Sequence, residues 1–511
     1  MPVNSTHPDY DATLPAWLRA RDVMAGEDAV KAAGEKYLPC LDSQSDDEYA
    51  AYRARASFFN ATARSAEAYI GLIFRRPPFV KLPESSSALG KALAGFAADV
   101  DLLGTPLATY AKGIVEEVVA VGRAGTLIDW ESAGENRVYV SRYAAEDILN
   151  WRTERLNGQT VLTLLVLAER GLPQGNVPPD PFQQDTVDQL RVLKLVPGTG
   201  VSPGSDAFSV HQPSSINHQP YCAVEIWQKL EVNQRTRGGA SPSGSKREWQ
   251  RVEVRMPLRL GKPLPLIPFV FHGPRHSQPD VDKLPMADVI AVNLDHYRLD
   301  ADYKHGMHFT ALPTAWVSGF DKESTLKIGS SAAWVTETTG ATAGFLEYTG
   351  QGLTTFERAL DRDERMLAVL GSRLLEGQKK VGETAQTIEL RQSGESSILA
   401  SLAGSVGASL TAVLRWAIWW NSTESMPDDV TRDQVLLELN TDFSTKGLSA
   451  QELTSIVAAW QNGALSRDSM LDLFRRGEIL PDGRTNEEEE RLVGKAGAAG
   501  AQQAVVAHAG V

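Results

Sequence analysis

The chain has 511 residues, of which 42% are hydrophobic and 23% charged, and its formal net charge is −13. This balance is typical of an ordinary folded protein and excludes the disordered and fibrous classes, and the length indicates several structural regions. The acidity disfavours a protein that grips nucleic acid through its phosphates, because such proteins carry a basic surface.

The two cysteines, Cys40 and Cys222, are far apart and lack CxxC spacing. They therefore predict neither a disulfide framework nor a zinc ribbon. The first residues contain neither a basic region nor an apolar core, so we expect no export signal and a reducing cytoplasm as the place of synthesis.

The first half of the chain changes from helical to strand-like patterns. One helix is predicted over residues 45–74, opened by the capping-box pair Ser45 and Glu48 and stopped by the Arg-Arg-Pro-Pro run at 75–78. A second helix is predicted over 106–121. Runs of β-branched and aromatic residues then predict strands at 126–130, 138–140, 149–152, 161–167, 192–196, 222–230 and 249–254. Long Pro/Gly/Ser-rich loops interrupt them at 171–184, 197–220 and 233–246.

A helix with an acidic line is predicted from Pro285, ending near Gly306. Asp288, Asp295 and Asp302 recur at every seventh position of it and therefore share one face. Residues 309–348 follow as a compact insert, with strand-like pieces at 315–317 and 333–336.

The next predicted helix spans residues 354–370 and begins at a Thr354–Glu357 capping box. At about 100° per residue it separates an acidic edge from a basic edge. The acidic edge contains Glu357, Asp361 and Glu364, and the basic edge contains Arg358, Arg362 and Arg365. Such a helix suits a ring in which the acidic edge of one copy faces the basic edge of the next. An exposed helix with ordinary internal ion pairs explains the pattern equally well.

The C-terminal part is predicted to be helical. A glycine-bounded loop at 371–382 carries Arg373, Gln378, Lys379 and Lys380, and a long helix is predicted over 383–420. The uncharged segment 396–414 is long enough to cross a bilayer, but its Ser, Gly and Ala content favours a helix buried in protein. A helical hairpin is predicted at 449–461 and 466–476, followed by a solvated helical tail.

Motifs for enzymatic chemistry do not occur in the sequence. It contains no GxxxxGK[ST] loop, no GxGxxG turn after a strand, no GxSxG elbow and no HExxH helix, so we expect no catalytic residues and no cofactor. His305 and His308, beside Asp302, are the nearest approach to a metal site, but surface or packed histidines are the commoner case and we expect no metal. The Lys379–Lys380 pair could touch phosphates, although most such pairs are solvated.

Several segments resemble a known family when they are taken in order. They are EYAAYRARASFFNATARSAEAYIGLIFRRPP from Glu48, ADVIAVNLDHYRLDADYKHGMHFTALPTAWVSG at 287–319, ETAQTIELRQSGESSILASLA from Glu383, and NGALSRDSMLDLFRRGEIL near the C-terminus. Together these segments, spread over about residues 45–480, resemble the portal proteins of tailed bacteriophages, which are the head-to-tail connectors.

The resemblance implies an α+β portal fold with a mixed α/β wing, a two-helix stem, a small β-containing clip, a long kinked wing helix and a helical crown. The implied boundaries are an N-terminal region and wing at 1–282, a first stem helix at 283–308, a clip at 309–350, a second stem helix at 351–372, a tunnel loop at 373–384, the wing helix and its return at 385–440, and the crown and tail at 441–511.

The implied function is a dodecameric ring at one capsid vertex of the virion, assembled in the host cytoplasm, through which double-stranded DNA is packaged and ejected. The implied partners are the terminase large subunit, a head-tail adaptor and the major capsid protein, with no membrane. Asp288, Asp295 and Asp302 are expected to line the channel, and the loop with Lys379 and Lys380 to face DNA. The alternatives are another virion structural or adaptor protein, and a metal-dependent hydrolase built on His305 and His308.

Overall fold

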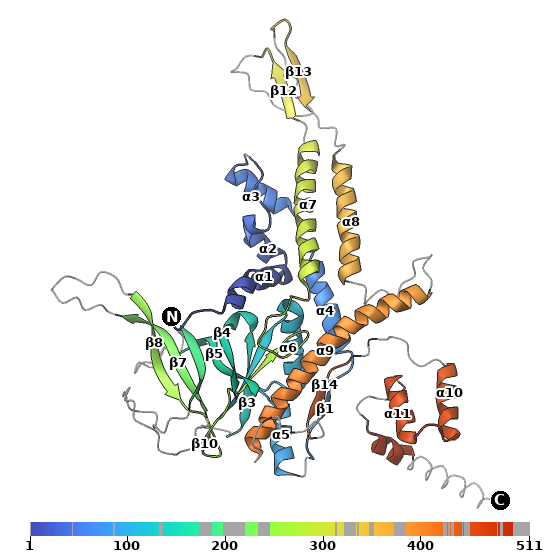
Figure 1. Ribbon diagram of the computed structural model, residues 1–511. Coiled ribbons are helices and arrows are strands. Elements are labelled where there is room, and N and C mark those ends of the chain that lie inside the picture. The colour runs from blue at the N-terminus through green and yellow to red at the C-terminus, as the bar shows by residue number, and fades with distance from the viewer. Residues whose placement is uncertain are drawn as a thin grey trace, which may run out of the picture.

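The computed structural model in Figure 1 describes most of the chain, and the statements below refer to those parts. They are residues 2–42, 44–84, 87–131, 136–156, 158–172, 186–197, 220–232, 246–311, 314–320, 334, 337–346, 352–371, 385–422, 427, 430, 434–441, 443, 450–477, 479–480 and 484–493.

The N-terminal region consists of short helices that pack along one side of a projecting helical pair, with α1 near its base and α3 farther along it (Figure 1). These helices are α1 (Pro8–Ala25), α2 (Glu27–Ala32), the 3₁₀ turn η1 (Gly34–Lys36), α3 (Asp46–Arg55) and α4 (Ala61–Ile73).

The single helix predicted over 45–74 is wrong, because the chain breaks between α3 and α4. The capping box of Ser45 and Glu48 does open α3, as predicted. At Ala56, however, ψ is 144°, which ends the helix. Asn60 then starts α4, since its side chain accepts a hydrogen bond from the backbone N–H of Ala63. The break lets the two helices pack in different directions.

Helix α6 (Leu107–Val121) confirms the helix predicted over 106–121 and forms a large part of the core. Ten of its 15 residues are buried. It ends at Gly122, whose φ of 75° is a left-handed conformation that glycine adopts without strain. The strand β1 (Phe79–Lys81) and the helix α5 (Ala88–Ala98) precede it.

The seven predicted strands are all present and belong to two antiparallel sheets. Five of them form a meander in sequence order, which consists of β4 (Ile148–Leu156), β5 (Gln159–Gly171), β6 (Val187–Val196), β7 (Tyr221–Val232) and β8 (Lys246–Arg255). The second sheet has the order β11 (Phe269–His272), β2 (Ala124–Trp130), β3 (Val138–Ala144). Strand β11 was not predicted, because its four residues are all buried and show no alternation.

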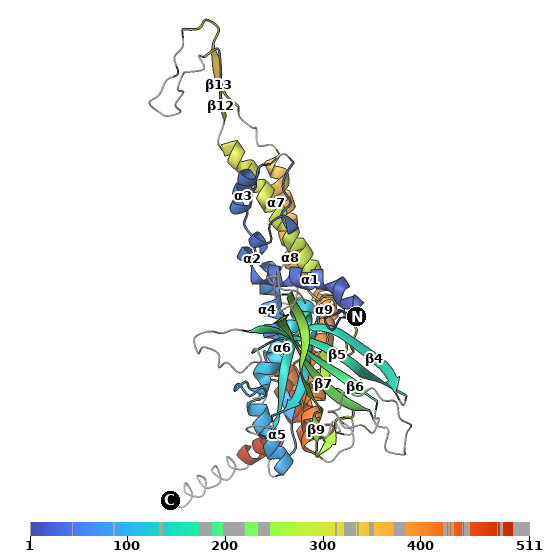
Figure 2. The same cartoon turned by 90° about the vertical axis from the view of Figure 1, so that its left-hand side faces the viewer.

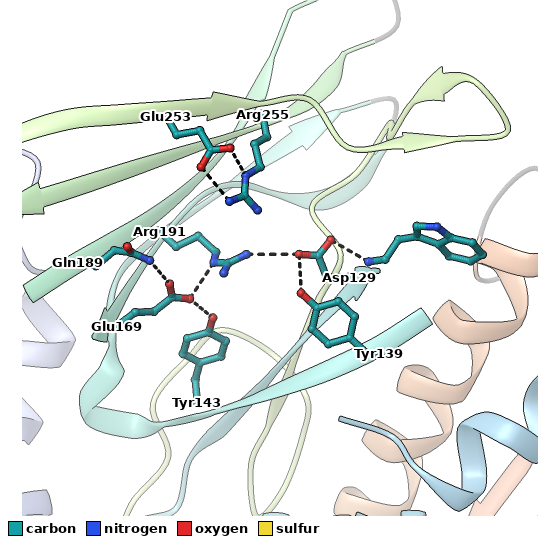
Figure 3. A network of polar contacts seen from close by, with 9 residues as sticks. Asp129, Tyr139, Tyr143, Glu169, Gln189, Arg191, Glu253 and Arg255 are labelled. Atoms are coloured by element: carbon teal, nitrogen blue, oxygen red, sulfur yellow. Dashed lines mark hydrogen bonds and ion pairs between the residues drawn. The ribbon is translucent and has the colours of Figure 1, made fainter. Parts of the chain in front are cut away.

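A polar network joins the two sheets (Figure 3). Arg191 of β6 donates to Glu169 of β5 over 2.7 Å and lies 3.3 Å from a carboxylate oxygen of Asp129 on β2. Tyr143 of β3 donates to Glu169, and Tyr139 of β3 donates to Asp129 over 3.4 Å. The Arg191 and Glu169 side chains are only 17% and 15% exposed. Because these groups satisfy one another, the network fixes how the sheets are placed relative to each other.

Helix α9 (Ala385–Asn421) confirms the long helix predicted over 383–420 and packs on β11 and on β14 (Leu436–Glu438). Its C-terminal end is held by Arg259, which lies on the short hairpin of β9 (Leu258–Arg259) and β10 (Lys262–Pro263). The Arg259 guanidinium donates to the backbone carbonyls of Trp419 and Ser422 over 2.8 and 2.7 Å. A cation at a helix C-terminus is favourable because the last carbonyls there lack partners within the helix.

One stretch of α9, Ile398–Asn421, is long and apolar enough to cross a bilayer by length and composition. Its mean hydropathy is 1.5, and 56% of its most apolar window is buried within the protein. Buried Trp416, Trp419 and Trp420 lie near its end. These contacts support the prediction of a helix that packs against protein.

Helices α7 (Ala287–Ala311) and α8 (Leu353–Gly371) project side by side from the body and carry a hairpin of β12 (Thr314–Ser318) and β13 (Thr342–Leu346) at their far end (Figures 1 and 2). We call α7 and α8 the stem and the hairpin the tip. The α+β fold class is therefore confirmed, whereas the finer division into wing, clip, tunnel loop and crown stays a prediction.

Three details of the stem and tip differ from the predictions. Helix α7 continues through Gly306 to Ala311. Gly306 serves close packing instead, because a Cβ there would come within 2.9 Å of the Leu353 side chain. The strand that pairs with β12 is β13 and not 333–336, and of that segment the described residue Trp334 is not in a strand. Helix α8 begins at Leu353, one residue before the predicted cap Thr354.

The C-terminal hairpin is confirmed as α10 (Ala450–Gln461) and α11 (Arg467–Arg476), with Ser466 capping α11. Residues 486–493 form a further helical segment, and this part of the predicted tail helix is confirmed. The three long loops predicted between strands lie for the most part outside the described residues.

Candidate functional site

The two stem helices are antiparallel and meet along a mixed polar and apolar seam. Gly306 lies opposite Leu353, the Tyr303 hydroxyl donates to Glu357 over 2.9 Å, and His296 lies 3.8 Å from Glu364. Successive contacts thus move down α7 as they move up α8. The seam gives each helix a defined rotation about its own axis.

This rotation places the charges of α8. Glu357 and Glu364 lie on the edge that contacts α7. At about 100° per residue, Arg358, Arg362 and Arg365 fall on the side away from α7 and α4. All three arginines are exposed. The acidic and basic edges predicted from the sequence are therefore both exposed, on different sides of the helix.

The Asp361–Arg365 ion pair within α8 is weak because both side chains are exposed to solvent. Asp361 and Arg365 are 3.7 Å apart, with side chains 65% and 77% exposed. Exposed pairs of this kind contribute about 0.3–0.5 kcal/mol. Asp361 and Arg365 therefore remain available to a partner at little loss to the isolated chain.

The acidic line of α7 is not uniform. Asp288 and Asp295 are exposed, and Asp288 pairs with Lys283 over 3.1 Å at the very base of the helix. Asp302 is half-buried and accepts a hydrogen bond of 2.5 Å from the hydroxyl of Tyr52 on α3. Burial, followed by this hydrogen bond, raises the pKa of Tyr52 well above its usual value. Two of the three predicted channel carboxylates therefore face solvent in the single chain.

Sequence reasoning missed the N-terminal layer that clamps α7. The backbone N–H of Ser57 donates to Asp300 over 2.7 Å, and Arg298 donates to the carbonyl of Tyr37 over 2.8 Å. Arg55 lies 3.3 Å from the Nδ1 atom of His305. These pairs are more than 240 residues apart in sequence, so no local pattern could have revealed them.

Asp363 is a buried carboxylate that the sequence reasoning also missed. Its side chain is only 2% exposed, and its Oδ1 atom lies 3.4 Å from the guanidinium of Arg362. Its Oδ2 atom has no hydrogen-bond partner among the described residues. The signal was present in the sequence, because Asp363 falls on the same face as the buried Leu367 at helical spacing.

The candidate ligand His305 and other histidines of this part of the chain have separate surroundings. His272 is buried in the body between Thr126 and Ser409, 2.7 Å from each hydroxyl. His305 packs against Phe309, and burial together with the nearby Arg55 lowers its pKa. His276 and His296 lie near carboxylates of other elements. Within the described residues, no three His, Cys, Asp or Glu side chains are grouped as metal ligands would be.

The predicted DNA-facing loop cannot be placed. Arg373, Gln378, Lys379 and Lys380 lie outside the described residues. Their expected role stays a prediction.

Comparison with known proteins gives one family and several distant structures. The family model "Domain of unknown function (DUF4055)" matches residues 285–421, which span the stem, the tip and α9. No curated protein matches the chain.

Among solved structures, the chain is similar to one titled "Neck of empty GTA particle computed with C6 symmetry", with 11% identity over 81% of this chain and 88% of that chain and a TM-score of 0.34. It is also similar to "Virion of native gene transfer agent (GTA) particle", with 11% identity over 90% and 99% of the two chains and a TM-score of 0.35. TM-scores this low do not establish a common fold.

Proposed function

We propose that this chain is the subunit of a phage portal ring, a virion protein at one capsid vertex that forms the DNA conduit for packaging and ejection. The observation that carries the proposal is the stem, two antiparallel helices that project from the body and end in a β-hairpin (Figure 1). A projecting pair of helices with exposed charges of both signs offers a surface for lateral contact with copies of itself.

The charges of α8 supply the lateral contact in this proposal. The acidic edge of one copy, formed by Glu357, Asp361 and Glu364, faces the basic edge of its neighbour, formed by Arg358, Arg362 and Arg365. Each edge spans about two helical turns. Because the contact joins two different edges of the same helix, it is heterologous, and it repeats around a closed ring when the rotation between neighbours closes. We expect twelve copies, as the sequence resemblance implies.

The acidic line of α7 lines the channel in this proposal. Asp295 and Asp288 are exposed, Asp288 beside Lys283, and Asp302 contributes its charge from beneath Tyr52. Carboxylates repel phosphates, so DNA can pass without adsorbing, since phosphate contacts are what strengthen DNA binding. The loop with Arg373, Gln378, Lys379 and Lys380 faces the DNA in this proposal.

In this proposal, other proteins supply the enzymatic activity. The terminase large subunit and a head-tail adaptor dock at the tip, and the major capsid protein surrounds the body. We assign no catalytic residue, cofactor or metal to the chain itself.

Negative-stain microscopy and mass photometry of the purified chain test the proposal. The wild type is expected to form closed rings with a central hole. The double variant Arg358→Glu, Arg365→Glu is expected to remain a monomer, with a melting temperature within a few degrees of the wild type, because both side chains are exposed in the single chain. Arg362 is left unchanged, because it pairs with the buried Asp363.

A charge-swapped control makes this test specific. Adding Asp361→Arg and Glu364→Arg to the double variant exchanges charge between the two edges and is expected to restore rings. Rings in the double variant alone, or a wild type without rings, would contradict the proposal. Lys379→Ala with Lys380→Ala is expected to change DNA retention in filled particles and to leave the ring intact.

A further inference from the structure

Arg55 is a half-buried cation whose hydrogen-bond partner is a histidine. Its guanidinium donates to the Nδ1 atom of His305 over 3.3 Å, and its Nε atom is buried without a partner among the described residues. An arginine side chain has only donors, so the Nδ1 atom of His305 has to be the acceptor and carries no proton. This hydrogen bond therefore exists only while His305 is neutral.

The pair joins two elements that are far apart in the sequence. Arg55 is the last residue of α3, and His305 lies near the C-terminal end of α7. Helix α3 lies beside α7 (Figures 1 and 2). The ring of His305 packs edge-on against Tyr52 of α3 and Phe309 of α7, with centroids 5.1 and 4.7 Å away. Both helices thus supply walls of the space that holds the imidazole.

The charged groups that face His305 come from both helices. On α3, the Glu48 carboxylate accepts two hydrogen bonds of 2.8 and 2.9 Å within its capping box. On α7, the Asp302 carboxylate accepts a hydrogen bond of 2.5 Å from a tyrosine of α3. The remaining groups are Arg55 and His308, which repel a second positive charge. A proton on His305 therefore meets a cation at 3.3 Å and two carboxylates that already have other donors.

These surroundings lower the pKa of His305. Burial is the largest cause and Arg55 the next, and together they outweigh the attraction of Asp302 and Glu48. A histidine with a lowered pKa in the native state contributes stability above its ordinary pKa of about 6.5, and this stability is lost as the pH falls towards the native value. Acid therefore favours any state in which His305 has left these surroundings.

Helix α3 depends on contacts of this kind for its structure. It has 10 residues, and helices shorter than about 12–15 residues are marginal in water without tertiary packing. Tyr52 is its buried residue, and the Tyr52 hydroxyl bonds to Asp302, three residues before His305. Repulsion between Arg55 and a protonated His305 thus acts beside the point at which α3 is anchored to α7.

We propose that Arg55 and His305 form an acid-sensitive latch, which holds α3 against α7 at neutral pH and loosens it when His305 takes up a proton. The loosened state uncovers the face of α7 that carries Asp302. The latch does not depend on the proposed ring, because both of its residues belong to one chain. It makes one side of the stem a movable part of the molecule.

Hydrogen–deuterium exchange of the purified full-length chain at about pH 7.5 and about pH 5.5 tests the latch. Dividing each rate by the intrinsic exchange rate at the same pH gives protection factors that can be compared. In the wild type, the protection of residues 46–55 is expected to fall about fivefold on acidification, since one proton gained only by the open state shifts the equilibrium by up to about tenfold per pH unit.

His305→Gln isolates the titration. Its amide oxygen accepts a hydrogen bond from Arg55 at either pH, so the protection of α3 is expected to change less than about twofold on acidification. His308→Gln is the matched control, because His308 is exposed on the same helix three residues away, and the wild-type pH dependence is expected there. Arg55→Ala is expected to lower the protection of α3 at neutral pH.

Three results would overturn the proposal. A wild-type pH dependence that persists in His305→Gln would show that another group titrates. Equal protection of wild-type α3 at the two pH values would show that protonation does not loosen it. Unchanged protection in Arg55→Ala at neutral pH would show that this contact does not hold α3.

Discussion

Two ion-paired arginines, Arg191 in the body and Arg365 in the stem, lie in opposite surroundings. Arg191 is 17% exposed and bridges two carboxylates between the sheets (Figure 3). Arg365 is 77% exposed and pairs with one carboxylate a turn away on its own helix. The body therefore uses charge to fix its own structure, whereas the stem leaves charge available for contacts with other molecules.

From this comparison, we expect the loss of Arg191 to have the largest effect on the free energy of unfolding. Arg191→Ala leaves Glu169 and Asp129 without their shared cation in a buried site, which is expected to lower the free energy of unfolding by about 3–5 kcal/mol. Urea denaturation measures it. The control is Arg255→Ala, since the Arg255–Glu253 pair is 55% and 34% exposed and its loss is expected to cost less than about 1 kcal/mol. Equal effects of the two variants would contradict the comparison.

Acid should weaken the body through His272. Burial lowers the pKa of this residue to about 3. Below its ordinary pKa of about 6.5 the unfolded chain binds a proton that the native protein does not, so stability falls as the pH drops from about 6.5 towards about 3. Between pH 6.5 and 4 the wild type is expected to lose on the order of 3 kcal/mol more than His272→Gln.

Urea denaturation of the wild type and of His272→Gln at the same series of pH values measures this difference. A wild-type slope that persists in His272→Gln would exclude His272 as the cause.

The smallest expected effects lie where the body meets the stem and on the stem itself. Tyr52→Phe removes the hydrogen bond to Asp302 and is expected to lower stability by about 1.5–3 kcal/mol, since the acceptor is charged and the Tyr52 side chain is buried. Asp361→Ala is expected to change it by less than about 0.5 kcal/mol. Thermal unfolding measures both. A larger effect for Asp361 would show that the stem charges stabilise the single chain.

Much of the fold follows from local patterns. Alternating β-branched residues predicted every strand of the meander, and the apolar stripes predicted α6, α8 and α9 within a few residues. The Ser45–Glu48 capping box was also correct, because its two residues and their bonds are local. The helical repeat alone was enough to predict the acidic and basic edges of α8.

Tertiary packing decided the remainder. Sequence alone implied that Gly306 ends a helix, but close approach of Leu353 gives this glycine another role. It placed Asp302 in one line with Asp288 and Asp295, but Tyr52, which is 250 residues away, covers that carboxylate. Spacing along one helix determines which side chains share a face, whereas the segment that packs against this face depends on the path of the whole chain. Short-range periodicity carries no information about that path.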